Sequence, residues 1–200
     1  MLIPPGDLVV ATGNAGKLAE FQRLLAPLPF NLRRQSEFDV IPAQETGLSF
    51  VENAILKARA ATQQTGLPAL ADDSGLEVDA LHGAPGVRSA RYADSGLDED
   101  NNSKLLEALK STPEQTRSAR FHCVLVVLRH PDDPVPLIAA GSWEGLILSA
   151  PRGDAGFGYD PLFFVPSHGV SAAELDPAQK NALSHRGIAV RRLLAQLQTH

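Results

Sequence analysis

Two adjacent carboxylates, Asp72 and Asp73, are the residues whose types and spacing most clearly suggest chemistry in this sequence. They follow Ala69–Ala71, which is expected to form a buried strand, and a polar break is predicted over Asp72–Gly75 before the strand pattern resumes at Leu76. Ionised carboxylates are costly to bury unless a metal ion, another cation or hydrogen-bond donors compensate their charge. One interpretation is therefore a site that binds a cation or moves a proton, in a cleft at the end of a buried strand. The alternative is a solvated turn, because Asp, Ser and Gly are ordinary turn formers.

The segment Thr12–Lys17 could bind an anion such as phosphate. It follows a predicted buried strand over Asp7–Thr12, and apolar residues recur at helical spacing from Leu18 to Leu28. In such a strand–loop–helix arrangement, backbone N–H groups at the helix start can hold a phosphate, and Lys17 adds a positive charge. The loop has neither the Walker A nor the Rossmann glycine pattern. The alternative is an ordinary helix start with Asn14 as its N-cap.

A second predicted helix could bring an acid and a lysine to the carboxylates. Ser49–Glu52 has the capping-box pattern, and an apolar stripe continues to Ala58. Lys57 lies on the border of that stripe, and Glu45 precedes the helix. The functional interpretation directs Lys57 and Glu45 into the cleft, whereas the alternative leaves Lys57 in solvent.

Three later segments carry further candidate binding residues. Gly156–Pro161 is rich in glycine and aromatic residues, so an aromatic side chain could stack on a flat ring, although it could also be a flexible hairpin loop. Asp176 followed by proline predicts a short helix that carries Lys180. Ser184–Gly187 begins the last predicted helix, and its His-Arg pair suits anion or carbonyl binding, or simply a structural role.

Length and composition limit the fold and exclude several classes. The 200 residues, 44% of them hydrophobic, suit one globular domain with two lobes. Long strands are expected over Ala119–Leu128 and Leu137–Leu148, joined as a hairpin. No apolar run reaches the roughly 18 residues of a membrane span, no signal-peptide pattern is present, and the single cysteine, Cys123, is expected in the core. These features favour the cytoplasm, and the net charge of −5 argues against broad nucleic-acid binding.

Five of these segments, taken together and in this order, resemble the inosine triphosphate pyrophosphatases, from about residue 8 to 197. The matching segments are Thr12–Lys17, Glu45–Lys57, Ala71–Gly75, Gly156–Pro161 and Ser184–Arg186. Ser49 stands where many members have threonine, a change that preserves the helix cap. The resemblance implies an α/β fold with a long central mixed β-sheet between two α/β lobes and an active-site cleft, as a single two-lobed domain over residues 1–200. It also implies a Mg²⁺-dependent homodimer that hydrolyses dITP, ITP or XTP to the monophosphate and pyrophosphate and so cleanses the nucleotide pool.

The resemblance assigns roles residue by residue. It implies that Asp73 is the proton acceptor and a Mg²⁺ ligand, with Glu45 as the second ligand. Lys57 is expected as a further catalytic residue that, with Lys17 and Lys180, stabilises the charge building on the phosphates and on the pyrophosphate leaving group. The substrate-binding residues that it implies are Thr12, Gly13, Asn14, Ala15, Gly16, Lys17, Ser74, Phe157, Gly158, Tyr159, Asp160, Lys180, His185 and Arg186. The loop from Thr12, with Ser74 and Lys180, is expected on the phosphates, and Phe157–Asp160 with His185 and Arg186 on the nucleoside.

Two other functions compete with this interpretation. A phosphatase with an aspartyl nucleophile is suggested by carboxylates that end a strand, but that chemistry normally requires two acids one residue apart and a nearby threonine. A non-catalytic nucleotide sensor or nucleic-acid module is disfavoured by the acidic charge and by the set of carboxylates and lysines.

Overall fold

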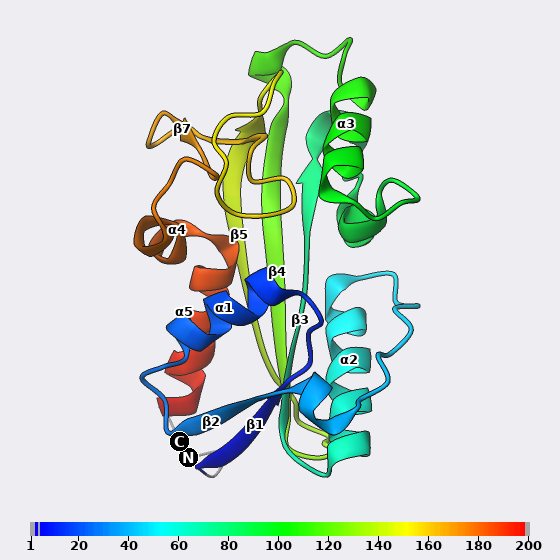
Figure 1. Ribbon diagram of the computed structural model, residues 1–200, viewed down its shortest axis with the longest axis vertical. Coiled ribbons are helices and arrows are strands. Elements are labelled where there is room, and N and C mark those ends of the chain that lie inside the picture. The colour runs from blue at the N-terminus through cyan, green and yellow to red at the C-terminus, as the bar shows by residue number, and fades with distance from the viewer. Residues whose placement is uncertain (1–2, 4, 199–200) are drawn as a thin grey trace. The chain divides into compact units, whose positions relative to one another are not determined.

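In the computed structural model the chain folds into a seven-stranded mixed sheet with helices (Figure 1). The structure describes residue 3 and residues 5–198. The strands are β1 Gly6–Val10, β2 Phe30–Arg34, β3 Ala69–Val78, β4 Ser118–Leu128, β5 Leu137–Ile147, β6 Phe163–Val165 and β7 Val170–Ser171. The α-helices are α1 Ala15–Leu24, α2 Phe50–Thr65, α3 Asp98–Ala108, α4 Pro177–Leu183 and α5 His185–Gln198. The strand order is β2-β1-β3-β4-β5-β6-β7, with β1 parallel to β2 and β3, and β6 antiparallel to β5 and β7. The expected α/β class with a mixed sheet is thus confirmed.

The chain divides into two compact units. Unit 1 comprises Met1–Asp73, Cys123–Gly141 and Arg186–His200, and unit 2 comprises Ser74–His122 and Ser142–His185. The strands β3, β4 and β5 each contribute residues to both units. Among the described residues, no helix is both long and apolar enough to cross a membrane.

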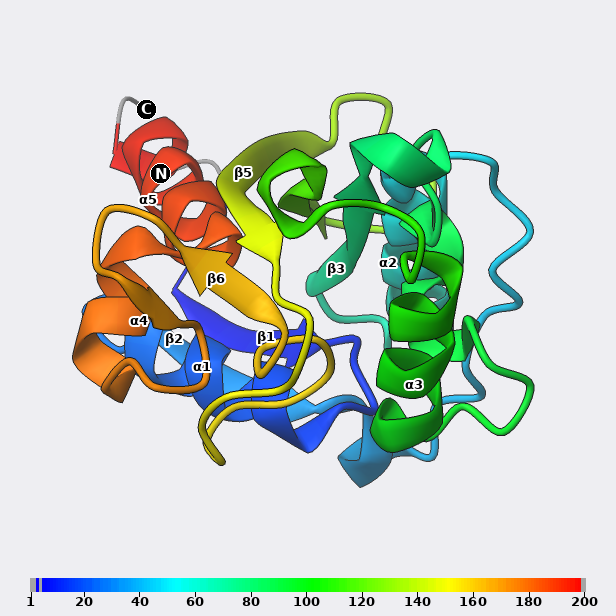
Figure 2. The ribbon, with the colours of Figure 1, turned by 90° about the horizontal axis from the view of Figure 1, so that it is seen from above.

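In unit 1, the period of two along each strand divides the apolar residues between two cores. Leu70 of β3 packs with residues of α1 and α5, whereas its neighbours Ala69 and Ala71 pack with the alanines of α2. The same alternation divides β4, because Leu125 belongs to the first core and Val126 to the second. Both views show α2 beside β3 (Figures 1 and 2).

Unit 2 has one apolar core of its own. It combines Leu76 and Val78 of β3 with Leu105 of α3 and with aromatic residues, among them Trp143 and Phe163. The predicted core position of Cys123 is confirmed in unit 1, where this residue is fully buried.

Most elements agree with their predicted bounds, and the main exception is at the carboxylates. The Asn14 cap, the Ser49–Glu52 capping box and the Asp176 cap all form. The predicted polar break over Asp72–Gly75 is wrong, because β3 continues through it as one strand of ten residues. The strand persists because cationic side chains offset the charge of both carboxylates, as the site geometry shows.

Candidate active site

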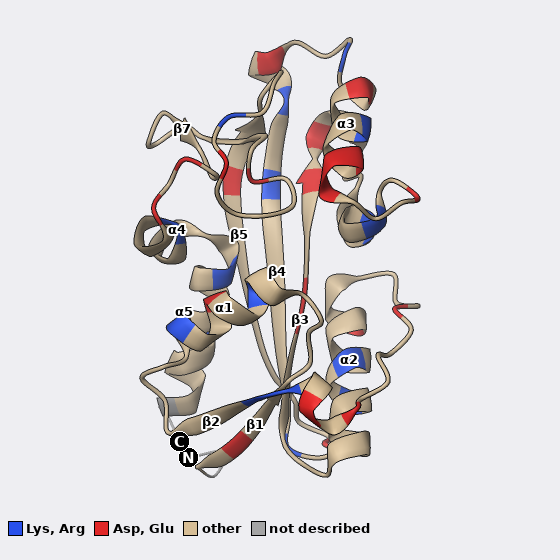
Figure 3. Cartoon of the chain, in the orientation of Figure 1, with Lys and Arg blue, Asp and Glu red and all other residues tan. Residues whose placement is uncertain are grey.

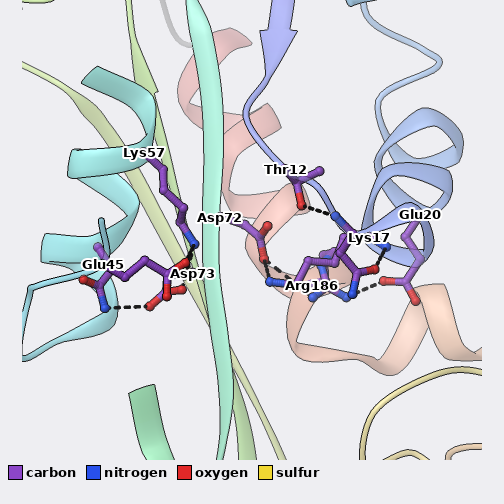
Figure 4. Close-up of polar contacts among 10 residues, drawn as sticks. Thr12, Lys17, Glu20, Glu45, Lys57, Asp72, Asp73 and Arg186 are labelled. Carbon is purple, nitrogen blue, oxygen red and sulfur yellow. Dashed lines mark hydrogen bonds and ion pairs between the residues drawn. The ribbon is translucent and has the colours of Figure 1, made fainter. Parts of the chain in front are cut away.

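Asp72 and Asp73 point to opposite sides of β3. The alternation that separates Leu70 from Ala71 continues along the strand, so Asp72 lies on the side of α1 and α5, and Asp73 on the side of α2 (Figure 4). Both residues are nearly inaccessible, at 2% and 5% exposure. The sheet therefore carries two separate ionic clusters from two consecutive residues. Figure 3 shows acidic residues within β3 and basic residues on α1 and α2.

The cluster on the α2 side combines two carboxylates, an ammonium and an amide. The ammonium of Lys57 donates to Asp73 Oδ1 at 2.8 Å and to Glu45 Oε1 at 3.3 Å. Asn53, one turn earlier on α2, donates to Asp73 Oδ2 at 3.3 Å and accepts from the Gly47 N–H at 2.8 Å. The predicted approach of Glu45, Lys57 and Asp73 is confirmed, and Lys57 is not a solvated surface residue.

Gly47 has a steric role in this cluster. A Cβ atom placed there would lie 2.6 Å from Glu52 Cβ and 2.8 Å from Asn53 Oδ1, which is too close for any side chain. Only glycine therefore lets the chain after Glu45 approach the start of α2 this closely.

The ionisation of Asp73 and Lys57 reflects burial and their mutual attraction. Burial raises the pKa of Asp73, the charge of Lys57 opposes this change, and the nearby Glu45 reinforces it, so the pKa stays above its ordinary value. Burial lowers the pKa of Lys57, but Asp72, Asp73 and Glu45 outweigh it and raise that pKa overall. Lys57 thus remains a cation beside a carboxylate that accepts a proton more readily than an ordinary aspartate does.

The cluster on the other side of β3 is a buried ion-pair network. Lys17 Nζ lies 2.8 Å from Asp72 Oδ2, and Arg186 Nη2 lies 3.7 Å from the same oxygen. Arg186 also donates to Glu20, which is buried on α1. Burial alone would raise the pKa of Asp72, but the charges of Lys17 and Arg186 outweigh it and hold this pKa well below its usual range. Asp72 is therefore an ionised counter-ion that joins the starts of α1 and α5.

The loop between β1 and α1 contains Asn14, the N-cap residue of α1. Asn14 Oδ1 accepts from the Lys17 N–H at 2.9 Å, and the Asn14 N–H donates to Thr12 Oγ1 at 3.2 Å. Gly13, Asn14 and Ala15 are exposed, and Thr12 and Gly16 are half-buried. The capping interpretation is confirmed, and this exposed helix start still allows an anion to approach its N–H groups.

Unit 2 contains the remaining predicted site residues. Lys180 Nζ donates to Asp160 Oδ2 at 2.6 Å and lies 4.9 Å from the centre of the Phe157 ring. His185 stacks on Phe121, with ring centres 4.8 Å apart and planes 15° from parallel. Ser74, half-buried, follows Asp73 on β3.

Asp160 stabilises the conformation of its own loop. Its carboxylate accepts from the Phe157 N–H at 2.8 Å as well as from Lys180, and it is 3% exposed. Tyr159 is buried too, its hydroxyl donates to the Ser89 carbonyl, and burial raises its pKa. Of the predicted base-binding loop, Phe157 and Gly158 are the more accessible residues.

The pair Glu45 and Asp73 fits a divalent cation of the Mg²⁺ type. Among the described residues, no three His, Cys, Asp or Glu side chains gather as a metal site. Mg²⁺ does not require such a set, because it is usually held by one or two carboxylates together with water and substrate phosphates. The two carboxylates already share one cation, the Lys57 ammonium, so their position suits positive charge.

Several residues of these clusters carry no clear signal in the sequence. Glu20 and Asn53 complete the two clusters of β3, and Asp98 and Asn102 contact Gly158. Two helical spacings are the available hints: Glu20 lies one turn after Lys17 on α1, and Asn53 lies one turn before Lys57 on α2.

Comparison with known proteins identifies the family. The model of the Ham1 family matches residues 8–196. This chain belongs to the Ham1 family. A dITP/XTP pyrophosphatase of Xanthomonas campestris pv. campestris is 60% identical over 191 residues, which are 95% of this chain and 96% of that protein. One from Vibrio cholerae is 56% identical over 192 residues, or 96% of each chain.

Solved structures of the family have the same fold. A HAM1 protein from Coxiella burnetii is 53% identical with a TM-score of 0.90, and the match covers 97% of this chain and 99% of that one. A structure described as nucleoside-triphosphatase / dITP/XTP pyrophosphatase, from Mycobacterium abscessus, is 40% identical with a TM-score of 0.76, over 96% and 99% of the two chains. The resemblance drawn from the five segments is therefore confirmed.

Proposed function

We propose that this chain is a Mg²⁺-dependent pyrophosphatase that hydrolyses dITP, ITP and XTP to the nucleoside monophosphate and pyrophosphate. The names of its relatives support the substrate class. The observation that carries the chemistry is the buried Asp73 carboxylate, which has a raised pKa and is held by Lys57 beside Glu45. Removal of these nucleotides before they enter nucleic acid is the cellular role that we propose.

Asp73 is the proposed general base. Its carboxylate accepts a proton from the attacking water, whose oxygen bonds to the α-phosphorus while the bond from that phosphorus to the bridging oxygen breaks and pyrophosphate leaves. Burial raises the pKa of Asp73 in the metal-free chain, and a bound Mg²⁺ would lower it, so the role rests on the position of the carboxylate beside Lys57 and Glu45. Lys57 and Asn53 contact separate oxygens of the carboxylate and so fix its orientation.

Glu45 and Asp73 are the proposed Mg²⁺ ligands. When bound, the ion neutralises phosphate charge and lowers the pKa of its water. We expect Glu45→Gln to raise the Mg²⁺ concentration for half-maximal activity by at least about tenfold, since loss of even an outer partner of a metal ligand costs about 10–100-fold. Asp132→Asn is the control, since Asp132 is an exposed acid of the same unit. An unchanged Mg²⁺ requirement in Glu45→Gln would remove Glu45 as a ligand.

Cationic side chains and backbone amides are the proposed phosphate contacts. Residues Thr12–Lys17 offer an exposed helix start, and Lys17 and Lys180 carry positive charge that offsets the negative charge of the triphosphate. Ser74 is the further proposed phosphate contact. Each lysine already contacts a carboxylate, Lys17 that of Asp72 and Lys180 that of Asp160, which limits its range of positions before substrate binds.

Phe157–Asp160, His185 and Arg186 are the proposed nucleoside contacts. Donors that face the 6-oxo group of hypoxanthine or xanthine would meet the amino group of adenine instead. A buried donor left without an acceptor costs about 1–3 kcal/mol, so one or two such contacts reject dATP by tenfold or more. We further propose that the chain acts as one two-lobed domain over residues 1–200, in a cytoplasmic homodimer.

The test is incubation of the protein with Mg²⁺ and, separately, dITP, XTP or dATP, with the products separated by chromatography. We expect pyrophosphate and monophosphate from dITP and XTP, and at least tenfold slower hydrolysis of dATP. Release of orthophosphate alone, or equal rates with dITP and dATP, would contradict the proposal. A trapped phospho-aspartate would favour the aspartyl phosphatase, and tight binding without turnover would favour a sensor.

A further inference from the structure

The loop that precedes β6 is held in unit 2 by two side chains of α3. The Gly158 N–H donates to Asp98 Oδ2 at 2.6 Å, and Asn102 Nδ2 donates to the Gly158 carbonyl at 2.9 Å. Asp98 and Asn102 are four residues apart on α3, so they lie on one side of the helix. Both polar backbone groups of a single glycine are thus bound by one helix.

These two hydrogen bonds fix the backbone conformation of Gly158. Gly158 has a φ of +61°, and glycine moves between backbone conformations more freely than other residues. A Cβ at Gly158 would meet nothing within 4 Å, so packing of neighbouring atoms does not confine this residue. The hydrogen bonds from α3 are therefore the contacts that define its conformation, and the bond to Asp98 is strengthened by the charge of the carboxylate.

The residues on either side of Gly158 are anchored by different means. The Tyr159 hydroxyl donates to the buried Ser89 carbonyl at 2.8 Å. The Phe157 N–H donates to Asp160, and Gly156 must lack a side chain because its Cβ would lie 2.2 Å from Asp160 Oδ2. The Phe157 side chain is held less firmly, since it is half-buried and packs under the Lys180 ammonium. The backbone of Gly158 thus links the firmly held Tyr159 to the exposed part of the loop.

We propose that Asp98 and Asn102 are positioning residues that set the orientation of Phe157 through Gly158. This inference rests on the proposed function, which assigns the loop to the nucleobase. With Gly158 held, the Phe157 ring is presented in one orientation and loses little freedom when a purine stacks on it. Without the two contacts, the loop must be ordered when substrate binds, and substrate affinity falls.

The experiment compares Asp98→Ala and Asn102→Ala with the wild type. Asp98→Asn is the conservative variant, because it keeps an oxygen that accepts from the Gly158 N–H. The controls are Glu99→Ala, which removes an exposed acid from the same helix turn, and Ser103→Ala, at an exposed neighbour of Asn102. Two quantities are measured for each protein: amide hydrogen exchange over residues 156–160, and kcat and KM with dITP and dATP.

We expect faster exchange over residues 156–160 in Asp98→Ala and Asn102→Ala. We also expect KM for dITP to rise about tenfold in Asp98→Ala, which loses a charge-assisted hydrogen bond, and about threefold to tenfold in Asn102→Ala, which loses a neutral one, with kcat changed less than about threefold in both. Asp98→Asn should recover most of the lost affinity, and both controls should match the wild type.

Two results would overturn the inference. Unchanged exchange in both alanine variants would show that α3 does not hold the loop, whatever the kinetics. Faster exchange with an unchanged KM would show that the hold has no bearing on the nucleobase. Failure of the wild type itself to release pyrophosphate from dITP would overturn the proposed function, and with it the nucleobase role of the loop, while the exchange data still report on Gly158.

Discussion

The two sides of β3 shift the pKa values of two adjacent aspartates in opposite directions. Asp72 meets Lys17 and the buried Arg186, and their charges hold its pKa well below the ordinary value. Asp73 meets one ammonium, from Lys57, with the acid Glu45 nearby, and its pKa is raised. At Asp72 the charges of Lys17 and Arg186 outweigh burial and make a stable anion, although Arg186 also pairs with Glu20. At Asp73 the Lys57 ammonium, which Glu45 shares, does not outweigh burial, and the carboxylate can accept a proton. The comparison shows that a structural acid and a proposed general base can be adjacent residues, provided that they face different neighbours.

The largest expected effect is on turnover, at Asp73. Asp73→Asn removes the proposed base and a metal ligand, so we expect dITP hydrolysis to fall by about 10³-fold or more, since a general base contributes about 10²–10⁴-fold. The unfolding free energy should stay within about 1 kcal/mol of the wild type, because the ionised carboxylate is not favoured by burial there. Steady-state kinetics and urea unfolding measure both quantities. A variant with most of its activity would remove Asp73 from this role.

The next effect is on stability, at Asp72. Asp72→Asn leaves Lys17 and the buried Arg186 without their shared counter-ion, and loss of one partner of a buried pair costs about 3–5 kcal/mol. Urea unfolding at neutral pH measures this change. Asp133→Asn is a useful comparison, because Asp133 is also buried but pairs with the more exposed Arg129. If Asp72→Asn unfolds like the wild type, the network does not stabilise the fold.

A smaller effect is expected from Lys57, which orients Asp73. Lys57→Ala should lower kcat by about 10–100-fold and raise KM by less than that, because the lysine acts on the base more than on substrate binding. Arg59→Ala removes an exposed cation from the same helix and serves as the control. Equal kcat in Lys57→Ala and in the wild type would contradict the orienting role.

The smallest effect is the pH dependence of stability, and its sign differs between the two acids. The lowered pKa of Asp72 means that its stabilising contribution is complete above the unfolded pKa of about 3.9 and is lost as pH falls toward its folded pKa. The raised pKa of Asp73 means that its contribution is present at low pH and is lost as pH rises through its folded pKa. The stability difference between wild type and Asp72→Asn should therefore be constant at neutral pH and shrink below about pH 4. A difference that stays constant to pH 3 would contradict this assignment.

The sequence alone predicts the elements better than it predicts how the carboxylates are held. Helix caps and capping boxes depend on residues two or three apart, so Asn14, Ser49 and Asp176 could be assigned from local pattern alone. The break expected over Asp72–Gly75 is wrong because local turn preference ignores cations that arrive from distant helices. Glu20 and Arg186 are 166 residues apart, and Asp98 and Gly158 are 60 residues apart, so a local sequence pattern cannot predict these contacts.

In the candidate site, too, the sequence predicts which residues come together but not how each carboxylate is held. The five segments locate Glu45, Lys57 and Asp73 because their types and order are distinctive, and the structure brings these three together. The five segments do not show that Asp72 and Asp73 have different roles, because the roles depend on which side of β3 each residue faces. Strand alternation supplies the rule, but it applies only once the strand is known to continue through both acids.

The two neighbouring carboxylates have pKa values displaced in opposite directions, down at Asp72 and up at Asp73. The most direct test is a pH titration of the side-chain carboxyl ¹³C shifts of Asp72 and Asp73 in the metal-free protein, assigned with the two asparagine variants. We expect Asp73 to titrate above the ordinary value of about 3.9, and Asp72 to remain ionised at pH values where ordinary aspartates are protonated. Equal pKa values, or a higher value at Asp72 than at Asp73, would contradict this opposite displacement.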